Sequence, residues 1–247
     1  MGSTLQEGMR AFSLLLLAAC SAVKPIPTTP EVAMSLPAPQ SNAVVIVRVP
    51  TPWWAPTFFI TGKFIDSIPE YAKAPGLLHK SYTFSERREF GGVYLWESRQ
   101  AAEAWFNEAW HERVRRQRGV DGDVRMLDAK YTVPGSASFT GKALPQHGLR
   151  TDAVITWVSS EPSVDASKLE RLASVLPSAQ GLVRVSFGTE QDGRLGVVSV
   201  WSSNAAANAY WTAERRAAVS SVIGAHTLST FDAPVVLDAA LAKRDAP

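Results

Sequence analysis

Residues 91–106 read GGVYLWESRQAAEAWF, and residues 196–211 read GVVSVWSSNAAANAYW. A constant offset of 105 positions superimposes the two segments without a gap and places Trp96 on Trp201. Matching order, spacing and residue type over this length indicate an internal repeat. Because a repeat of roughly a hundred residues can bury a core of its own, we expect two small related domains and not a solenoid.

The repeat extends into the flanking sequence, and each half has the same predicted order of elements: strand, helix, strand, strand, helix, strand. Runs of β-branched residues are typical of buried strands, and Ser98 and Ser203 are suitable N-caps for the helices that follow them. The expected strands are 43–49, 77–84, 92–97 and 123–133 in the first half, and 153–158, 182–187, 195–201 and 227–237 in the second. The expected helices lie within 65–74, 99–110, 165–176 and 204–222.

This order is that of the ferredoxin-like β-α-β-β-α-β unit, in which two helices cover one face of a four-stranded antiparallel sheet. The strands carry apolar residues on both sides, so the other face of each sheet also needs cover. The second repeat can supply it. We therefore predict an α+β fold with two tandem ferredoxin-like domains, 43–133 and 151–240, which are joined by a linker at 134–150 and packed sheet to sheet within one chain.

The chain begins with the features of a bacterial lipoprotein signal. Arg10 precedes a short apolar run that closes with Leu17-Ala18-Ala19-Cys20. Secretory signals combine a positive start, an apolar stretch too short to span a bilayer and small residues at the cleavage point. We predict residues 1–20 to be this signal, with Cys20 carrying the lipid that anchors the protein in the bacterial cell envelope, facing the periplasm or the exterior. The alternative is a buried apolar helix with a structural thiol.

Residues 21–42 form a predicted linker that is rich in proline and in small polar residues. Proline-rich linkers are extended and semi-rigid, so this segment would hold the folded part away from a membrane. Cys20 is the only cysteine in the chain, and no disulfide is expected. Both domains must therefore be stable through apolar burial alone.

The charge balance does not indicate a charged macromolecular partner, because the formal net charge is only +2. The one basic run lies at 111–118 and is most simply a solvated helix end, with anionic lipid headgroups as an alternative contact. We expect no nucleic-acid partner for an exported, nearly neutral protein.

Several common kinds of active site have no support in the sequence. The four histidines, His79, His111, His147 and His226, are scattered and have no cysteine or carboxylate at ligand spacing, so no metal site is predicted. There is also no glycine-rich phosphate loop and no Gly-x-Ser-x-Gly motif around a nucleophilic serine.

The segment Gly76-Leu77-Leu78-His79-Lys80-Ser81-Tyr82, followed by residues 91–98 and 101–106, resembles the dimeric α+β barrel superfamily. Within that superfamily it is most similar to the antibiotic biosynthesis monooxygenase-like proteins of the YdhR type. The resemblance covers residues 43–133 well, and 153–237 follows as a more divergent copy. Family members usually build the barrel from two subunits. The resemblance therefore implies a monomer that acts as a pseudo-dimer, with further association still open.

The resemblance also implies a pocket for a small, flat, often aromatic molecule. Some members oxidise quinol-like substrates with dioxygen and without a cofactor, and a few degrade haem. In the cofactor-free case the substrate supplies the electrons once it is deprotonated. The protein then needs an apolar cavity and one or two polar groups that stabilise the anion. On this basis we expect no cofactor and a small apolar or aromatic partner.

The candidate catalytic residues lie on the strand 77–84, where side chains alternate between two faces. His79 is on one face, and Lys80 and Tyr82 are on the other. His79 is a possible base and Lys80 a possible stabiliser of an enolate-like oxygen, but alternation leaves open which face lines the pocket. The matched positions in the second half are Arg184, Val185 and Phe187. Because the polar groups are lost or changed there, one pocket per chain is expected.

Aromatic side chains supply the expected pocket wall. Trp53, Trp54, Phe58 and Phe59 have no counterpart in the second half and are predicted to line a pocket or lid, with simple burial as the alternative. Further candidates are Tyr94, Trp110 and His111. Trp96 and Trp105 recur as Trp201 and Tyr210, which favours a packing role for that pair.

Two functions remain open from sequence. The first is an oxidoreductase, a lipid-anchored protein with monooxygenase-like domains. The second is a non-enzymatic lipoprotein that binds a small ligand or acts as a scaffold and has a degenerate pocket. They differ in whether the polar groups of His79, Lys80 and Tyr82 converge on a cavity or face solvent.

Overall fold

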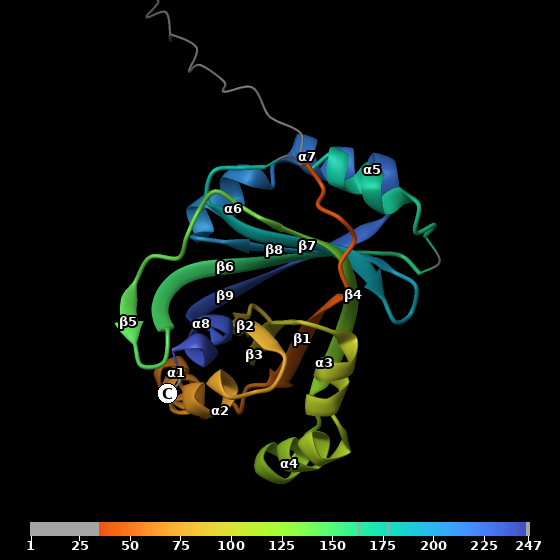
Figure 1. Cartoon of the computed structure of the whole chain (residues 1–247). Helices are drawn as coiled ribbons and strands as arrows, with labels where there is room; N and C mark the ends of the chain where they lie inside the picture. Colours follow the sequence, from red (N-terminus) through yellow and green to blue (C-terminus); the bar gives the residue numbers. More distant parts are fainter. Residues whose placement is uncertain (1–34, 163, 177, 246–247) are drawn as a thin grey trace, which may run out of the picture. The chain divides into compact units, whose positions relative to one another are not determined.

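The strands form one antiparallel sheet that curls into a closed barrel (Figure 1). The computed structural model describes residues 35–162, 164–176 and 178–245. The predicted signal with Cys20 and the first part of the proline-rich linker lie outside these residues. None of the described helices is long and apolar enough to cross a bilayer.

All eight predicted strands are present. The first half contains β1 (Asn42–Pro50), α1 (Thr57–Asp66), α2 (Ile68–Ala72), β2 (Leu77–Ser85), β3 (Glu89–Trp96), α3 (Arg99–Trp105), α4 (Glu108–Arg118) and β4 (Asp123–Pro134). The second half contains β5 (Lys142–Leu144), β6 (Gly148–Ser160), α5 (Lys168–Ser174), β7 (Leu182–Glu190), β8 (Leu195–Trp201), α6 (Asn204–Tyr210), α7 (Ala213–Ile223), β9 (His226–Asp238) and α8 (Ala239–Arg244).

Eight strands close the barrel in the order β6-β8-β7-β4-β1-β3-β2-β9, with a β6–β9 pairing and β5 added at the edge of β6. The two halves join edge to edge through β4–β7 and β2–β9. The sequence predicted that the two sheets pack against each other. The structure shows in addition that their edge strands are hydrogen-bonded, through the β4–β7 and β2–β9 pairings. Closure removes the open edges that a separate four-stranded sheet would expose.

The strands at the centre of each half, such as β1 and β8, are buried on both faces, because one face points into the barrel and the other lies under helices. The interior core includes Val44, Ile46, Leu95, Ile155 and Val200. Two further cores lie between the sheet and the helices, one for each half. Figure 1 shows α5, α6 and α7 gathered on one side of the barrel and α1 to α4 on the other.

The helices differ most from the sequence prediction. Each long second helix is broken in two, because a polar side chain caps a new start: Asn107 accepts a hydrogen bond from the Trp110 N–H (3.2 Å), and Thr212 accepts one from the Arg215 N–H (3.3 Å). The first helix starts at Thr57, earlier than expected. The short β5 in the predicted linker and the terminal α8 were not predicted.

The matched tryptophans Trp96 and Trp201 are both fully buried, but among the described residues only the Trp201 indole N–H has a hydrogen-bond partner. The Trp201 Nε1–H donates to Thr156 Oγ1 (2.9 Å). The Trp96 Nε1–H has no acceptor among the described residues, since Val45 occupies the position that matches Thr156.

We therefore expect Trp201→Phe to lower the free energy of unfolding by about 1 kcal/mol more than Trp96→Phe, because only the first change breaks a buried hydrogen bond. Urea unfolding of the two single variants measures this difference. Equal losses would show that the indole N–H of Trp201 contributes nothing net.

Candidate functional site

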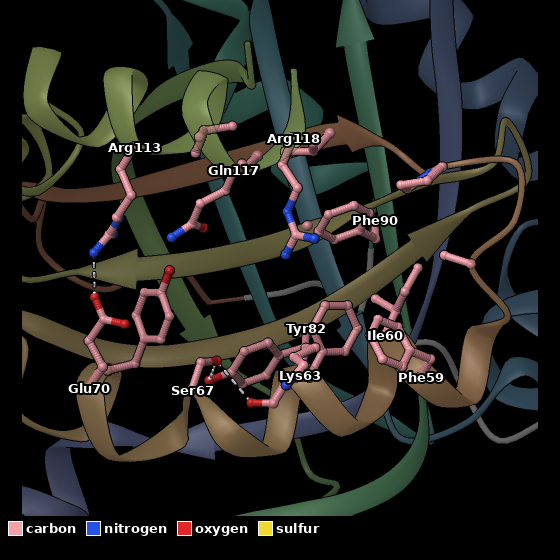
Figure 2. Close-up of a pocket in the computed structure, with 18 of the residues that line it drawn as sticks. Phe59, Ile60, Lys63, Ser67, Glu70, Tyr82, Phe90, Arg113, Gln117 and Arg118 are labelled. Carbon is pink, nitrogen blue, oxygen red and sulfur yellow. Dashed lines mark hydrogen bonds and ion pairs between the residues drawn. The ribbon is translucent and has the colours of Figure 1, made fainter. Parts of the chain in front are cut away.

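A cavity of about 220 Å³ lies between the sheet and the helices of the first half. Strands β1, β2 and β3 form its floor, α1 and α2 form one wall, and α4 forms the other. Figure 2 shows Arg113 and Arg118 of α4 reaching over the cavity towards the α1–α2 side. There Arg113 Nη1 pairs with Glu70 Oε1 at 2.9 Å. Cavities for drug-sized ligands start at about 300 Å³, so this one suits a small molecule.

The break between α1 and α2 positions a hydroxyl group in the cavity. Pro69 has no backbone N–H and suits the first turn of a helix, so a new helix starts there instead of α1 continuing. Ser67 sits at the break, where its hydroxyl donates to the Phe64 carbonyl (2.9 Å) and lies 3.1 Å from the Tyr82 hydroxyl. The contact between Ser67 and Tyr82 thus links the α1–α2 wall of the cavity to β2, the strand that carries Lys80.

Lys80 is the central polar residue of the cavity. Its side chain is buried, and its Nζ lies 2.9 Å from the ring centroid of Tyr71, 3.8 Å from that of Tyr82 and 4.8 Å from that of Tyr94. Aromatic ring faces attract a cation. The three rings therefore form a cage that stabilises the ammonium form of Lys80.

Burial acts in the opposite direction and dominates. It lowers the pKa of Lys80 well below the usual 10.5, while the negative charge of Glu70 raises this pKa and the positive charge of Arg113 lowers it further. The uncharged amine is the form that can accept a proton. Lys80 therefore combines a low proton affinity with a cage that is ready for the protonated form, which suits a general base.

The tyrosines around Lys80 keep their protons. Burial raises the pKa values of Tyr71, Tyr82 and Tyr94 above the usual value of 10.0. Their phenolic hydroxyls are therefore hydrogen-bond donors at neutral pH. Donors of this kind stabilise an oxyanion when they point at the place where negative charge develops.

A buried lysine without a carboxylate in direct contact should cost stability. We expect Lys80→Met to raise the free energy of unfolding at pH 6 to 7 by about 1–4 kcal/mol, because it removes the desolvation penalty. Because burial holds the pKa of Lys80 in the folded chain below 10.5, the unfolded chain binds more protons than the folded chain between the folded-state pKa and 10.5, so wild-type stability rises with pH over that interval. The advantage of the variant should shrink over this range. Urea unfolding between pH 6 and 9 tests this, and a constant advantage would contradict the lowered pKa.

The structure brings several predicted residues to this cavity. Those that line it are Lys80, Tyr82, Tyr94, Trp54, Phe59 and Trp110. Trp53 and Phe58, predicted to join them, are 84% and 79% exposed and lie outside the lining. His111 also lies outside it and is held by Asp121, with Nδ1 and Oδ1 2.7 Å apart.

His79 is separated from the other two catalytic candidates. It points into the barrel, where its Nδ1 lies 3.7 Å from Asp238 Oδ2, while Lys80 and Tyr82 face the helices. Lys80 and Tyr82 therefore converge on the cavity, whereas His79 does not. The alternation of β2 was predicted correctly, and both of its faces are enclosed.

The matching region of the second half is an apolar core. Val185 and Phe187, which occupy the positions of Lys80 and Tyr82, are buried there against Leu195 and Val197.

The basic run 111–118 forms most of α4, which ends at Gly119 (φ 74°). Two of its charged side chains, Arg113 and Arg118, line the rim of the cavity.

Sequence reasoning missed Tyr71, Ser67 and Glu70. Tyr71 lies in a short helix whose buried residues Ile68, Tyr71 and Ala72 follow the i, i+3, i+4 spacing of a helix face. That spacing was the available signal. Within the described part of the chain, no group of three or more His, Cys, Asp or Glu side chains is arranged to hold a metal ion.

Comparison with known proteins places the fold. No protein-family model matches the chain, and no curated protein matches it. Solved structures do match. A putative monooxygenase of Fusobacterium nucleatum superimposes with a TM-score of 0.59 at 10% identity, over 81% of this chain and 95% of that one.

Two other solved structures are similar to a comparable extent. A second putative monooxygenase, from Lactobacillus acidophilus, gives a TM-score of 0.53 at 12% identity, over 81% of this chain and 97% of that one. An anthrone oxidase-like protein gives 0.52 at 15% identity, over 81% and 94%. At these identities the likeness concerns the fold alone. The chain has the monooxygenase-like α/β barrel fold of these three proteins.

Proposed function

We propose that this protein oxidises a small aromatic or quinol-type substrate in the cavity around Lys80, with dioxygen and without a cofactor. The observation that carries this proposal is the buried Lys80 amine within a cage of three protonated tyrosines, on the wall of a small cavity. The fold, shared with two putative monooxygenases and an anthrone oxidase-like protein, supports the same reaction class.

The proposed first step is a proton transfer. The uncharged Lys80 amine removes an acidic proton from the substrate, either from a phenolic O–H or from a C–H activated by an adjacent aromatic carbonyl. The ammonium ion that forms remains against the faces of Tyr71 and Tyr82. The substrate oxyanion accepts hydrogen bonds from tyrosine hydroxyls, which remain protonated.

The anion then supplies the electrons. For a CH₂ group between aromatic rings, as in an anthrone, the balance is R₂CH₂ + O₂ → R₂C=O + H₂O. One oxygen atom bonds to carbon, and the other leaves as water with the two hydrogens. For a quinol the balance is QH₂ + O₂ → Q + H₂O₂. The protein supplies the base, the anion-stabilising donors and an apolar enclosure.

We also propose that the chain is two ferredoxin-like units in tandem, held at a membrane by a lipid on Cys20. The matched strand orders β4-β1-β3-β2 and β9-β6-β8-β7 support the tandem units. The sequence Leu17-Ala18-Ala19-Cys20 supports the anchor. Trp53 and Phe58 are exposed and adjoin Trp54 and Phe59 of the cavity lining in sequence, and aromatic side chains of this kind suit a membrane interface. An apolar substrate could then enter from the lipid.

The test is an oxygen-electrode assay of the purified chain with anthrone and with a short-chain hydroquinone. We expect oxygen uptake to depend on the enzyme, and ¹⁸O from ¹⁸O₂ to appear in the ketone formed from anthrone. Heat-inactivated protein controls for autoxidation. Saturable substrate binding without oxygen uptake would instead assign the chain to the non-enzymatic ligand-binding alternative.

A further inference from the structure

A second, larger cavity of about 800 Å³ opens at one end of the barrel interior. Its lining includes residues of β5, the start of β6 and the end of β9, and none of the residues that line the Lys80 cavity. Most of the wall is apolar, with Leu95, Phe139 and Val236 among the lining residues. Its volume is in the range of pockets that hold drug-sized ligands.

Two strands on opposite sides of the barrel bring polar side chains into this cavity. Three strands separate β2 from β7 in either direction around the barrel. His79 on β2 pairs in register with Leu95 and Asp238, and Arg184 on β7 pairs with Val200. Leu95 and Val200 both belong to the interior core. His79 and Arg184 therefore face the same space, and they are matched positions of the repeat.

The Arg184 side chain has no hydrogen-bond or ion-pair partner within the described ranges. Asp238 acts on the Arg184 guanidinium through space only. One Asp238 oxygen accepts the Leu241 N–H (2.9 Å), and the other lies 3.7 Å from His79 Nδ1. Burial lowers the pKa of Arg184 to about 10, so the guanidinium stays charged at neutral pH. A cation without a partner in a mostly apolar cavity is costly unless an anion binds it.

His79 adds a hydrogen-bonding group without a second charge. Burial, and after it the positive charge of Arg184, lowers the pKa of His79 to about 4, so the imidazole is neutral at pH 7. A neutral imidazole offers one donor and one acceptor. Two identical halves would have the same side chain at positions 79 and 184. This chain instead has an imidazole at position 79 and a guanidinium at position 184.

We propose that this end of the barrel binds an apolar monocarboxylate, whose carboxylate pairs with Arg184 and hydrogen-bonds to His79 while its hydrocarbon body contacts Leu95, Phe139 and Val236. A guanidinium matches a carboxylate through two parallel N–H···O bonds, which gives the pairing specificity. This binding site is separate from the proposed oxidation and does not depend on it.

Isothermal titration of the full chain carrying Cys20→Ser, to which no acyl chain can be attached, tests the proposal with decanoate and with 1-decanol as the uncharged match. We expect one decanoate site per chain, at least tenfold weaker binding in Arg184→Gln, and partial rescue in Arg184→Lys. Binding of 1-decanol should be weaker and insensitive to Arg184. The control Arg113→Gln, at the rim of the other cavity, should leave decanoate binding unchanged.

A second variant guards against misfolding of Arg184→Gln. Ala143 is exposed on β5 and lines the cavity mouth, so Ala143→Trp should narrow the mouth and weaken decanoate binding without disturbing a core. Absence of saturable decanoate binding would overturn the proposal. So would full binding in both Arg184→Gln and Ala143→Trp, or a loss seen only in Arg113→Gln.

Discussion

Lys80→Met is expected to lower kcat for the substrate oxidised by the chain by about a hundredfold or more, because general bases and oxyanion stabilisers contribute at least this much. The variant keeps the length and apolar body of the side chain, and it should fold at least as well as the wild type. A loss of turnover would therefore be chemical in origin. The oxygen electrode measures it directly, with anthrone or hydroquinone at saturating concentration.

The matched control is Lys130→Met. Lys130 is an exposed lysine whose Nζ pairs with Glu170 Oε1 at 2.7 Å, and neither residue lines the cavity. Its replacement should leave kcat within about twofold, as surface substitutions rarely do more. If Lys80→Met retained wild-type turnover, the role assigned to the amine would be wrong.

His79→Ala should preserve turnover, which differs from the expectation based on sequence alone. His79 faces the interior of the barrel and lines the other cavity, so its removal leaves the surroundings of Lys80 intact. Comparable losses of kcat in His79→Ala and Lys80→Met would indicate that the reaction takes place elsewhere than proposed.

Cys20→Ser is expected to abolish lipid attachment and to move most of the chain from the membrane fraction to the soluble fraction. A serine hydroxyl cannot form the thioether that carries the lipid, and stable anchoring depends on the attached acyl chains. Metabolic labelling with an alkyne-bearing fatty acid measures acylation directly, and fractionation of cell envelopes measures the location.

Ser21→Ala is the control for Cys20→Ser, since it changes the neighbouring residue and keeps the thiol. It should be labelled and sedimented as the wild type is. If Cys20→Ser were found with membranes at the wild-type level and the signal were cleaved as before, the anchor assignment would fail. Partial retention without label would indicate a contribution from the exposed Trp53 and Phe58.

The strands could be predicted from the sequence because each is a long run of apolar, often β-branched residues repeated at a fixed offset. The helix breaks could not, because Asn107 and Thr212 act as caps only when the chain turns there, and helix-favouring residues such as alanine, glutamate and arginine on either side favour one continuous helix. Short elements such as β5, with three residues, carry too little periodicity to detect.

The site was predictable only in part, for a reason that lies in barrel geometry. In a half-buried strand, polar residues mark the exposed face. In β2 both faces are enclosed, so His79 on one face and Lys80 on the other look alike in sequence. The prediction for Trp53 and Phe58 was wrong for a different reason: aromatic composition predicts burial or binding, whereas their exposure depends on where the loop before α1 lies and on which face of α1 Phe58 occupies.

The seam between β2 and β9 sets a condition on how this chain folds. Lys80 pairs in register with Leu237, near the end of the described chain, so the barrel stays open until its last strand has arrived. Until then the edge of β2 that pairs with β9 is exposed, and the interior core that contains Val44 and Leu95 lacks the β9 side chains Phe231 and Val236. Contacts this distant in sequence form slowly, and open edges invite pairing with other chains. During biogenesis, the incomplete chain is the species most in need of a chaperone.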